Sequence, residues 1–440
     1  MSDDKKSINI MHISDIHCGI DDTLDEIGVW RRKTVIDSFN QFVKDIPSDW
    51  KPDIIAITGD LGWRGEEEDY KKFGDFLTEL LDALELTVND VICCPGNHDK
   101  YLPAEQEFPK EMEEAGGYYS VSRVYDHMQM FVGEFAAYCN ALRQEKIPLL
   151  RNKSTIEDAK FLYGYRIIKG LCFVVFNSAW LCDWRKMDEN GRSLDRGNLT
   201  IDENMYFEII NMDLPHLPTI AMYHHPKEWL KESEIGISND LPPTAIEHME
   251  SMVDIVLNGH MHMTKGEKNR DYLHYVVGTI SSNDVTRSEC VLLKIFIDQN
   301  DAKLIHIDEA ECYSQWHHKK VKWYFEINNT SWESNNKHKP EDRKKLTEIY
   351  RKFLKDTSIF KQFSSEEQEI MERGSLEQLA DIAYRAMATK KVNILVMVRL
   401  LLEITKTLSN SANNDAEEKE RGKALVKNLH FSTIIRWWKR

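Results

Sequence analysis

Residues suited to metal binding occur in five short clusters along the chain. These are Asp15-Ile16-His17, Gly59-Asp60, Gly96-Asn97-His98-Asp99, His224-His225-Pro226 and Gly259-His260-Met261-His262. Carboxylates, imidazoles and one neutral amide suit first-row divalent ions. A pair of such ions needs about this many donors, delivered by several segments to one place. One Asp-x-His alone is a weak signal, but five clusters in this order predict a dinuclear metal centre.

Short apolar runs precede the clusters and are typical of buried strands. The runs are Ile8 to Ile13, Asp53 to Thr58, Val91 to Cys94, Thr219 to Tyr223 and Asp254 to Leu257. Helical patterns from Trp30 to Val43 and from Glu67 to Leu86 come before the second and third runs. This alternation predicts an α/β fold with a largely parallel sheet, whose ligands gather beyond the carboxyl ends of the strands.

In order and local sequence, the clusters resemble the calcineurin-like metallophosphoesterase superfamily over roughly Ile8 to His262. The resemblance implies a two-sheet sandwich flanked by helices. It also implies hydrolysis of phosphoric esters by a metal-activated hydroxide, with two divalent ions as cofactors. Manganese is expected first, and iron, zinc or magnesium would also suit these ligands.

The resemblance also assigns roles to single residues. The first metal would be held by Asp15, His17, Asp60 and His262, and the second by Asp60, Asn97, His224 and His260, so that Asp60 bridges. His98 would contact the phosphate and protonate the leaving oxygen, and Asp99 would orient its imidazole. His225 competes with His224, but the family pattern His-x-Pro favours His224. His317-His318 fits a solvated basic face.

The substrate class is less sharply indicated. Asp99, where the Ser/Thr phosphatases have glutamate, argues against them, while Arg64 stands where they keep a phosphate-binding arginine and Trp63 replaces their aspartate. SbcD-type nucleases usually have a histidine shortly after the bridging aspartate, and none follows Asp60 before His98. The closest resemblance is to the cyclic-nucleotide phosphodiesterases. Trp63 would stack on a base or serve as a structural tryptophan.

We therefore predict hydrolysis of phosphodiester bonds in nucleotides or nucleic acids. The alternatives are a DNA or RNA nuclease within a multi-protein complex, a phosphomonoesterase, and a non-enzymatic scaffold that binds a partner. The formal net charge of −16 argues against broad non-specific binding of nucleic acid. The eight cysteines form no CxxC pair, the charged N-terminal residues are not expected to be a signal peptide, and the apolar run from Val392 to Leu402 is too short to span a bilayer. A cytoplasmic location is expected.

The chain is predicted to contain a catalytic domain (1–326), a linker (327–345) and a C-terminal helical module (346–440). The module would mediate oligomerisation or docking to a protein partner, or would cap the core. Residues 100–160 form an insertion, with a helix from about Val124 to Leu142, that either lines the cleft or is a packing subdomain.

Later parts of the catalytic domain are predicted from shorter signals. Phe161 to Ile168 and Leu171 to Phe176 predict a hairpin turning at Lys169-Gly170. Three further strands, within 272–277, 290–297 and 302–308, are expected to complete a second, more antiparallel sheet. The polar loop that follows Phe176 and runs to Thr200 carries Arg185, Arg192 and Arg196, which would contact substrate or lie on a solvated face.

Overall fold

The computed structural model describes residues 5–102, 124, 127–183, 185–210, 212, 214–231, 235, 245–268, 272–281, 287–298, 303–328 and 331–333. The chain divides into two units, Met1–Ile235 with Ala245–Asn335 and Gly236–Thr244 with Asn336–Arg440. All described residues lie in the first unit. The predicted module 346–440 and most of the predicted linker lie outside them, so both remain predictions.

Among the described residues, seven strands form a first sheet around β1 (Lys5–Ile13). On one side, β2 (Ile54–Thr58) and β3 (Val91–Cys94) continue it in parallel. On the other side, β10 (Glu289–Asp298), β11 (Lys303–His317) and β12 (Lys320–Ile327) continue it antiparallel, and β13 (Trp332–Glu333) pairs with β11. The parallel half brings the carboxyl ends of β1, β2 and β3 to one edge.

A second sheet of six described strands has the order β4-β5-β6-β7-β9-β8. Its strands are β4 (Gly164–Ile168), β5 (Leu171–Val175), β6 (Thr219–Met222), β7 (Ile255–Asn258), β8 (Lys265–Lys268) and β9 (Leu273–Val276). β5, β6, β7 and β9 are parallel, and only the edge pairs β4–β5 and β8–β9 are antiparallel. The hairpin at Lys169-Gly170 is confirmed, with positive φ at both residues.

The predicted membership of the second sheet was wrong. Segments 290–297 and 302–308 belong to the first sheet as β10 and β11, because they extend its free edge beside β1. The second sheet is mainly parallel because α8 (Glu203–Ile210) and α10 (Ala245–Met252) return the chain before β6 and β7.

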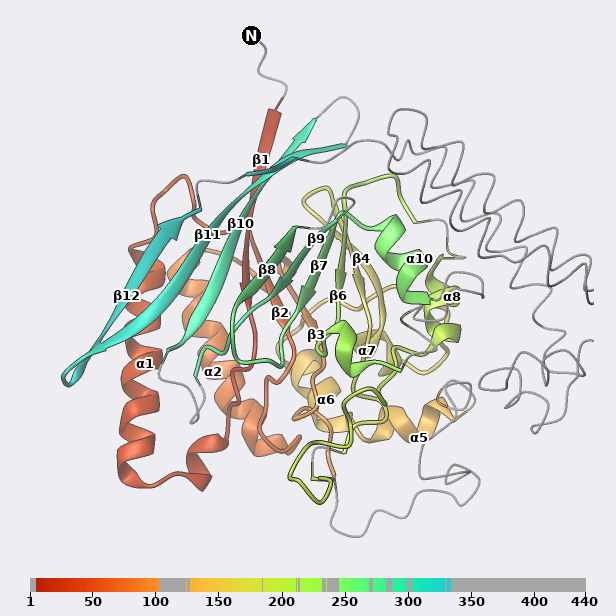
Figure 1. Ribbon diagram of the computed structural model, residues 1–440, viewed down its shortest axis with the longest axis horizontal. Helices are drawn as coiled ribbons and strands as arrows, with labels where there is room; N and C mark the ends of the chain where they lie inside the picture. Colours follow the sequence, from red (N-terminus) through yellow and green to blue (C-terminus); the bar gives the residue numbers. More distant parts are fainter. Residues whose placement is uncertain are drawn as a thin grey trace, which may run out of the picture. The chain divides into compact units, whose positions relative to one another are not determined.

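The two sheets enclose one apolar core. Ile10, Ile54 and Ile92 from the first sheet pack in the same cluster as Phe173 and Ile220 from the second, and none is more than 1% exposed. β2 is buried along its whole length, which suits its sequence Ile-Ile-Ala-Ile-Thr. The predicted α/β sandwich is thereby confirmed, with helices lying along both sheets (Figure 1).

α1 (Glu26–Lys44) and α2 (Glu67–Leu84) confirm the two predicted helices beside the first sheet. Val35, Phe39 and Val43 form the buried stripe of α1, and the Phe39 ring lies 5.0 Å from that of Trp323 on β12. Within the described ranges, short 3-10 turns cover Ile20–Thr23, Val88–Asp90 and Lys227–Trp229. None of the described helices is long and apolar enough to cross a membrane.

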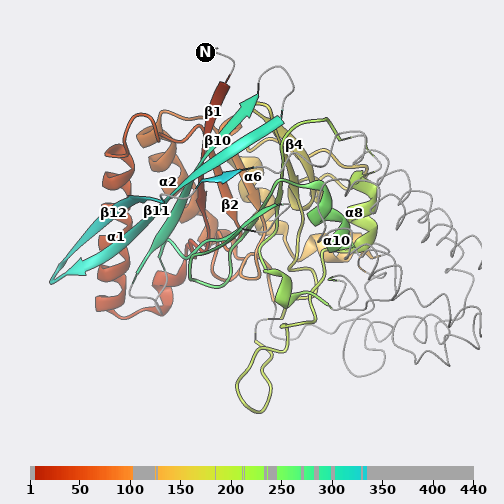
Figure 2. The ribbon, with the colours of Figure 1, turned by 45° about the horizontal axis from the view of Figure 1, so that its top comes forward.

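The insertion is described only in part, since residues 103–123 and 125–126 lie outside the described ranges. Its predicted helix is two helices, α5 (Met128–Gly133) and α6 (Ala136–Gln144), separated where Phe135 leaves helical geometry. A further short helix, α7 (Ala159–Leu162), occupies the start of the predicted strand 161–168. The loop between β5 and α8 projects away from the sheets (Figure 2).

Candidate metal centre

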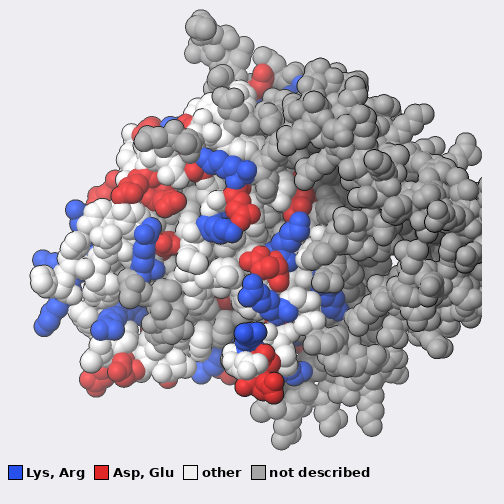
Figure 3. Space-filling model, in the orientation of Figure 1, with Lys and Arg blue, Asp and Glu red and all other residues white. Residues whose placement is uncertain are grey.

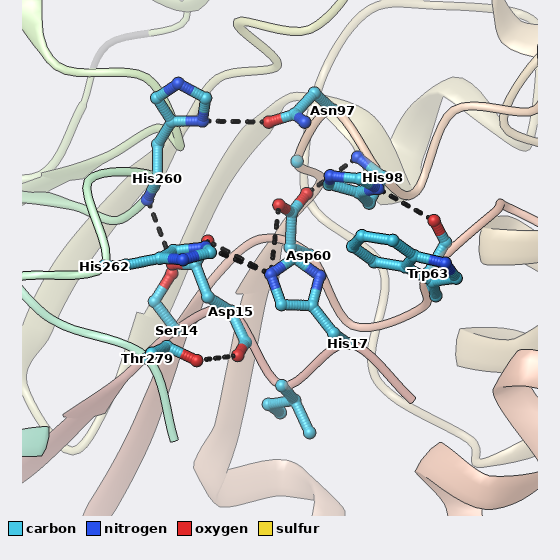
Figure 4. A network of polar contacts seen from close by, with 12 residues as sticks. Ser14, Asp15, His17, Asp60, Trp63, Asn97, His98, His260, His262 and Thr279 are labelled. Atoms are coloured by element: carbon cyan, nitrogen blue, oxygen red, sulfur yellow. Dashed lines mark hydrogen bonds and ion pairs between the residues drawn. The ribbon is translucent and has the colours of Figure 1, made fainter. Parts of the chain in front are cut away.

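The loops that follow five strands meet at one edge of the sandwich. Backbone hydrogen bonds join them: Asp15 N donates to Gly59 O (3.1 Å), His17 N to Asp60 O (2.9 Å) and Gly259 N to His224 O (2.9 Å). Asp15, Asp60 and Asn97 follow the first sheet's parallel strands, whereas His224 and His260 follow β6 and β7 of the second. Both sheets therefore contribute side chains to one site (Figure 4).

The backbone is unusual at the positions that supply these side chains. Five candidate ligands have left-handed conformations: Asp15 (φ 53°), His17 (51°), Asp60 (55°), His260 (71°) and His262 (51°). Residues other than glycine rarely adopt such angles, and clusters of them occur at functional sites, where the surrounding structure imposes them.

A first group of donors contains Asp15, His17, Asp60 and His262. Nε2 of His17 lies 3.2 Å from Nε2 of His262, which is 3.1 Å from Oδ1 of Asp15. The His17 nitrogen is also 3.7 Å from Asp15 Oδ1 and 3.9 Å from Asp60 Oδ2. Ligands about 2.1 Å from one ion lie roughly 3–3.5 Å from one another. The spacing therefore fits a divalent ion, for which the buried Oδ1 of Asp15, next to His262, is a candidate ligand atom.

A second group contains Asn97, His224 and His260, and shares Asp60 with the first. Asn97 Oδ1 is 3.0 Å from both His224 Nε2 and His260 Nδ1, and His224 Nε2 is 3.3 Å from Asp60 Oδ2. His224 Nδ1 lies 2.6 Å from Thr58 O, so its proton points to that carbonyl and Nε2 offers a lone pair. Metal-binding histidines commonly have this arrangement. It favours His224, rather than His225, as the ligand.

Asp60 lies between the two groups and is almost fully buried. Its Oδ1 accepts a hydrogen bond from the backbone N of His98 (2.8 Å). Gly96 passes so close that an added Cβ would lie 2.1 Å from this oxygen, which explains why the position needs glycine. Burial alone would raise the pKa of Asp60, but the imidazoles of His224 and His98 hold it below the ordinary value.

The electrostatics of the histidines also fit bound cations. Burial lowers the pKa of His17 and of His260 to about 3, so both rings are neutral and have lone pairs to offer. Burial opposes the charge on His224 as well, but the adjacent Asp60 carboxylate raises the pKa of His224 to about 9. Positive charge is therefore favoured beside Asp60, where a cation would lie. Three-residue subsets of these side chains have the spacing of metal ligands.

His98 lies beside the first group, stacked on Trp63. The two rings are 4.3 Å apart and inclined by 10°, and the His98 ring is 4.9 Å from that of His17. Nδ1 of His98 lies 2.8 Å from the Trp63 carbonyl oxygen (Figure 4). Trp63 thus fixes the imidazole through both its ring and its backbone.

Asp99 has a different environment from the one we expected. Its carboxylate accepts from the backbone N atoms of Leu61 (3.3 Å), Gly62 (2.9 Å) and Gly96 (2.9 Å), and from the Tyr70 hydroxyl (3.0 Å). The contact that orients His98 comes from the Trp63 carbonyl instead. Asp99 therefore ties the loop carrying Asp60 to the loop carrying Asn97.

Two of the four candidate arginines, Arg64 and Arg185, are held by acidic or backbone partners. Arg64 forms ion pairs with Asp22 (3.4 Å), Glu66 (3.4 Å) and Asp69 (3.6 Å). Arg185 pairs with Asp183 (2.9 Å) and donates to Leu102 O (3.1 Å). Arg192 and Arg196 are exposed on the projecting loop. None of the four appears among the side chains that form the two donor groups.

Two features of the site were not predicted from the sequence. Lys100 is fully buried, and its Nζ contacts Glu134 Oε2 (3.1 Å), Trp180 O (2.8 Å) and Cys182 O (3.0 Å). The sequence shows a lysine directly after the predicted Gly-Asn-His-Asp cluster. It does not indicate which residues this lysine contacts in the fold.

Trp229 is the second unpredicted feature. Its ring meets His260 edge-on at 4.1 Å, and its Nε1 donates to Met261 Sδ at 3.4 Å. Trp229 therefore lies against the second donor group, whereas Trp63 lies against His98, beside the first. Its position three residues after Pro226 was a weak signal that carried no chemistry by itself.

Three comparisons with known proteins show what the chain is similar to. A model of the calcineurin-like phosphoesterase family matches residues 8–264. The chain is similar to a candidate 5'-nucleotidase from Staphylococcus aureus, with 14% identity, a TM-score of 0.38 and coverage of 74% of this chain and 55% of that one. For a phosphatase from Mycoplasma pneumoniae the values are 12%, 0.34, 74% and 95%. A comparison with curated protein sequences found no match.

Proposed function

The chain belongs to the calcineurin-like phosphoesterase family, and from that premise we propose that it is a dinuclear metal-dependent phosphodiesterase acting on nucleotides. The observation that carries the proposal is the pair of donor groups sharing Asp60. Asp15, His17, Asp60 and His262 would hold one divalent ion, and Asp60, Asn97, His224 and His260 the other. Manganese is the ion we expect first.

When bound there, divalent ions supply Lewis-acid charge to a phosphoryl oxygen and lower the pKa of a water molecule. The protein's own contribution to proton transfer would come from His98. Because the Nδ1 proton points to the Trp63 carbonyl, Nε2 is the atom that would face the substrate, and it can donate a proton to the leaving oxygen only when the ring is an imidazolium. The stacked Trp63 ring restrains the imidazole and reduces the entropy cost of orienting it.

The ion pairs of Arg64 favour phosphodiesters over phosphomonoesters as substrates. A phosphomonoester carries a second negative charge on the transferred group, which an additional cation would help to bind. Arg64 is the cation that the sequence offers for this role, and it is already paired with Asp22, Glu66 and Asp69. A diester, with one charge fewer, does not require it.

Two tryptophans support a substrate with an aromatic group. Trp63 and Trp229 are both partly exposed, and they contact His98 and His260 at the two donor groups. Nucleobases stack on such rings. On the face shown in Figure 3, basic and acidic side chains of the described residues are interspersed, which suits a small nucleotide better than a long polyanion.

A nuclease that acts within a protein complex is the second candidate. The loop between β5 and α8 starts at the carboxyl end of β5, the edge at which the donors lie, and it exposes Arg192 and Arg196. These side chains could contact the backbone of a nucleic-acid strand. In this case the predicted C-terminal module would supply the docking surface.

The test is product analysis with Mn²⁺-loaded protein. The substrates are cyclic nucleotides, single-stranded DNA and RNA, duplex DNA, nucleoside monophosphates, and the matched pair bis-p-nitrophenyl phosphate and p-nitrophenyl phosphate. Preferential hydrolysis of cyclic nucleotides and of the bis ester is expected. Shortened polymers would favour the nuclease, and preferential hydrolysis of monoesters would overturn the phosphodiesterase proposal. Asp60→Asn is the control for contaminating activity.

A further inference from the structure

His225 follows the candidate ligand His224 but has no role in the chemistry described so far. It is fully buried, and its Nε2 has no hydrogen-bond partner in the described part of the protein. A buried polar atom without a partner costs roughly 1–3 kcal/mol, so each one calls for an explanation, of which a bound ligand is one. We infer that His225 is a further catalytic residue, which donates a hydrogen bond from Nε2 to a phosphoryl oxygen of the substrate.

The hydrogen bonds of Ser178 determine which nitrogen of His225 carries the proton. Ser178 Oγ accepts from the backbone N of His225 (3.0 Å), and the same oxygen lies 2.9 Å from His225 Nδ1. The hydroxyl has one proton to donate, and within the described residues Nδ1 is the acceptor in reach. In the neutral ring Nδ1 therefore accepts, and the proton is on Nε2.

The adjacent histidine has the opposite arrangement. His224 directs Nδ1 to a carbonyl oxygen, which can only accept, and so keeps a lone pair on Nε2 for a metal. His225 directs Nδ1 to a hydroxyl, and so presents an N–H at Nε2. The two neighbouring imidazoles are thereby suited to different partners: His224 to a cation, and His225 to an anion or a polarised oxygen.

The surroundings of His225 place this donor next to the second group of candidate ligands. Its ring centroid is 4.5 Å from that of His260, 4.8 Å from that of His224 and 6.0 Å from that of Trp229. The three histidines also bring nitrogen atoms within 4.8 Å of one another. A phosphoryl oxygen held at the second group would therefore lie near the His225 ring. A fixed N–H there would stabilise negative charge that develops on that oxygen.

This inference rests on the proposed function, because it assumes a phosphoryl ligand. It differs from the simplest alternative, that His225 is itself a metal ligand. Ligation through Nε2 would require the proton to move to Nδ1, and the buried Ser178 hydroxyl would then lose its acceptor. The two possibilities predict different metal contents in variants of His225.

The experiment uses His225→Phe in the full chain, with His274→Phe as the control for loss of another largely buried histidine outside the donor groups. Metal content is measured by elemental analysis, and binding of inorganic phosphate to the Mn²⁺-loaded protein by calorimetry. We expect an unchanged metal content and an affinity for phosphate about 10- to 100-fold lower, the usual effect of removing one hydrogen bond to a charged group. The control should change neither quantity.

Loss of metal in His225→Phe would show that His225 is a ligand, and unchanged phosphate affinity would show that it is only structural. Either result overturns the inference. If the variant does not fold, ¹⁵N NMR of histidine in the wild-type protein provides the test: a proton on Nε2 of His225 supports the inference, and a proton on Nδ1 alone refutes it. Phosphate binding needs no turnover, so a failed substrate screen would not be mistaken for a failed role of His225.

Discussion

Replacing Glu134 with leucine is expected to destabilise the protein strongly through Lys100. Lys100 is 0% and Glu134 8% exposed, and their side chains are 3.1 Å apart. Glu134→Leu would leave the ammonium group buried, with the carbonyl oxygens of Trp180 and Cys182 but without the Glu134 carboxylate. Removing one partner of a buried ion pair typically costs about 3–5 kcal/mol. Because two carbonyl bonds remain, we expect the lower end, about 3 kcal/mol.

The double variant Lys100→Met/Glu134→Leu distinguishes the charge effect from general disruption of packing. Replacing both members of a buried pair by apolar residues is often nearly neutral. Here the carbonyls of Trp180 and Cys182 would lose a shared donor, which we expect to cost about 1–2 kcal/mol. The double variant should therefore be more stable than Glu134→Leu alone, with a coupling energy of about 2 kcal/mol or more.

Urea denaturation of the four proteins in this cycle, followed by circular dichroism, gives the free energies of unfolding. Glu145→Leu, at the half-buried C-cap residue of α6, is the control. If Glu134→Leu lowered stability by less than 1 kcal/mol, or if the two substitutions were additive, Lys100 would not depend on Glu134 for its charge. The reasoning from burial and distance would then be wrong.

Three further predictions concern the metal centre. Asp60→Asn should lose bound metal and nearly all activity, because the shared carboxylate has no substitute; near-normal turnover in that variant would refute the assignment. His98→Asn should keep its metal while the rate falls ~10²–10⁴-fold, and an unchanged rate would remove His98 from the mechanism. Chelation should abolish activity and lower Tm, and excess Mn²⁺ should restore both; a Tm indifferent to chelation would argue against ions bound to the folded state.

The residues predicted as metal ligands do lie together in the structure, because the order of strands and loops that positions them can be read locally. Asp15, Asp60 and His224 each stand two residues after the end of a strand, and parallel strands bring such positions together whatever their spacing in the chain. Side chains that act through distant partners could not be assigned in this way. Arg64 was a candidate for binding phosphate, but its carboxylate partners include Asp22, 42 residues away. Likewise, β10 pairs with β1 because that edge of the first sheet is free. The local sequence of β10 does not indicate which sheet it joins.

In the motif Gly96-Asn97-His98-Asp99, Asn97 and His98 face the donor groups, whereas Asp99 holds two loops together. This supporting role of Asp99 leads to a last prediction. Each of its oxygens receives two hydrogen bonds: Oδ2 from Leu61 N and Gly96 N, and Oδ1 from Gly62 N and Tyr70 OH. An asparagine could keep one oxygen toward the first pair, and Tyr70 could turn to accept from the amide.

Gly62 N would nevertheless face an N–H₂ group, and the charge would be lost. Asp99→Asn should therefore cost about 2 kcal/mol of stability and weaken metal binding, even though the side chain keeps its shape. Tyr70→Phe, which removes one of the four hydrogen bonds, should have a smaller effect on both. Thermal unfolding and metal titration would measure these changes. If the variant instead had normal stability and metal affinity but a slower reaction, the loops would not need the charge of Asp99. Asp99 would then act on His98, and the reasoning above would be wrong.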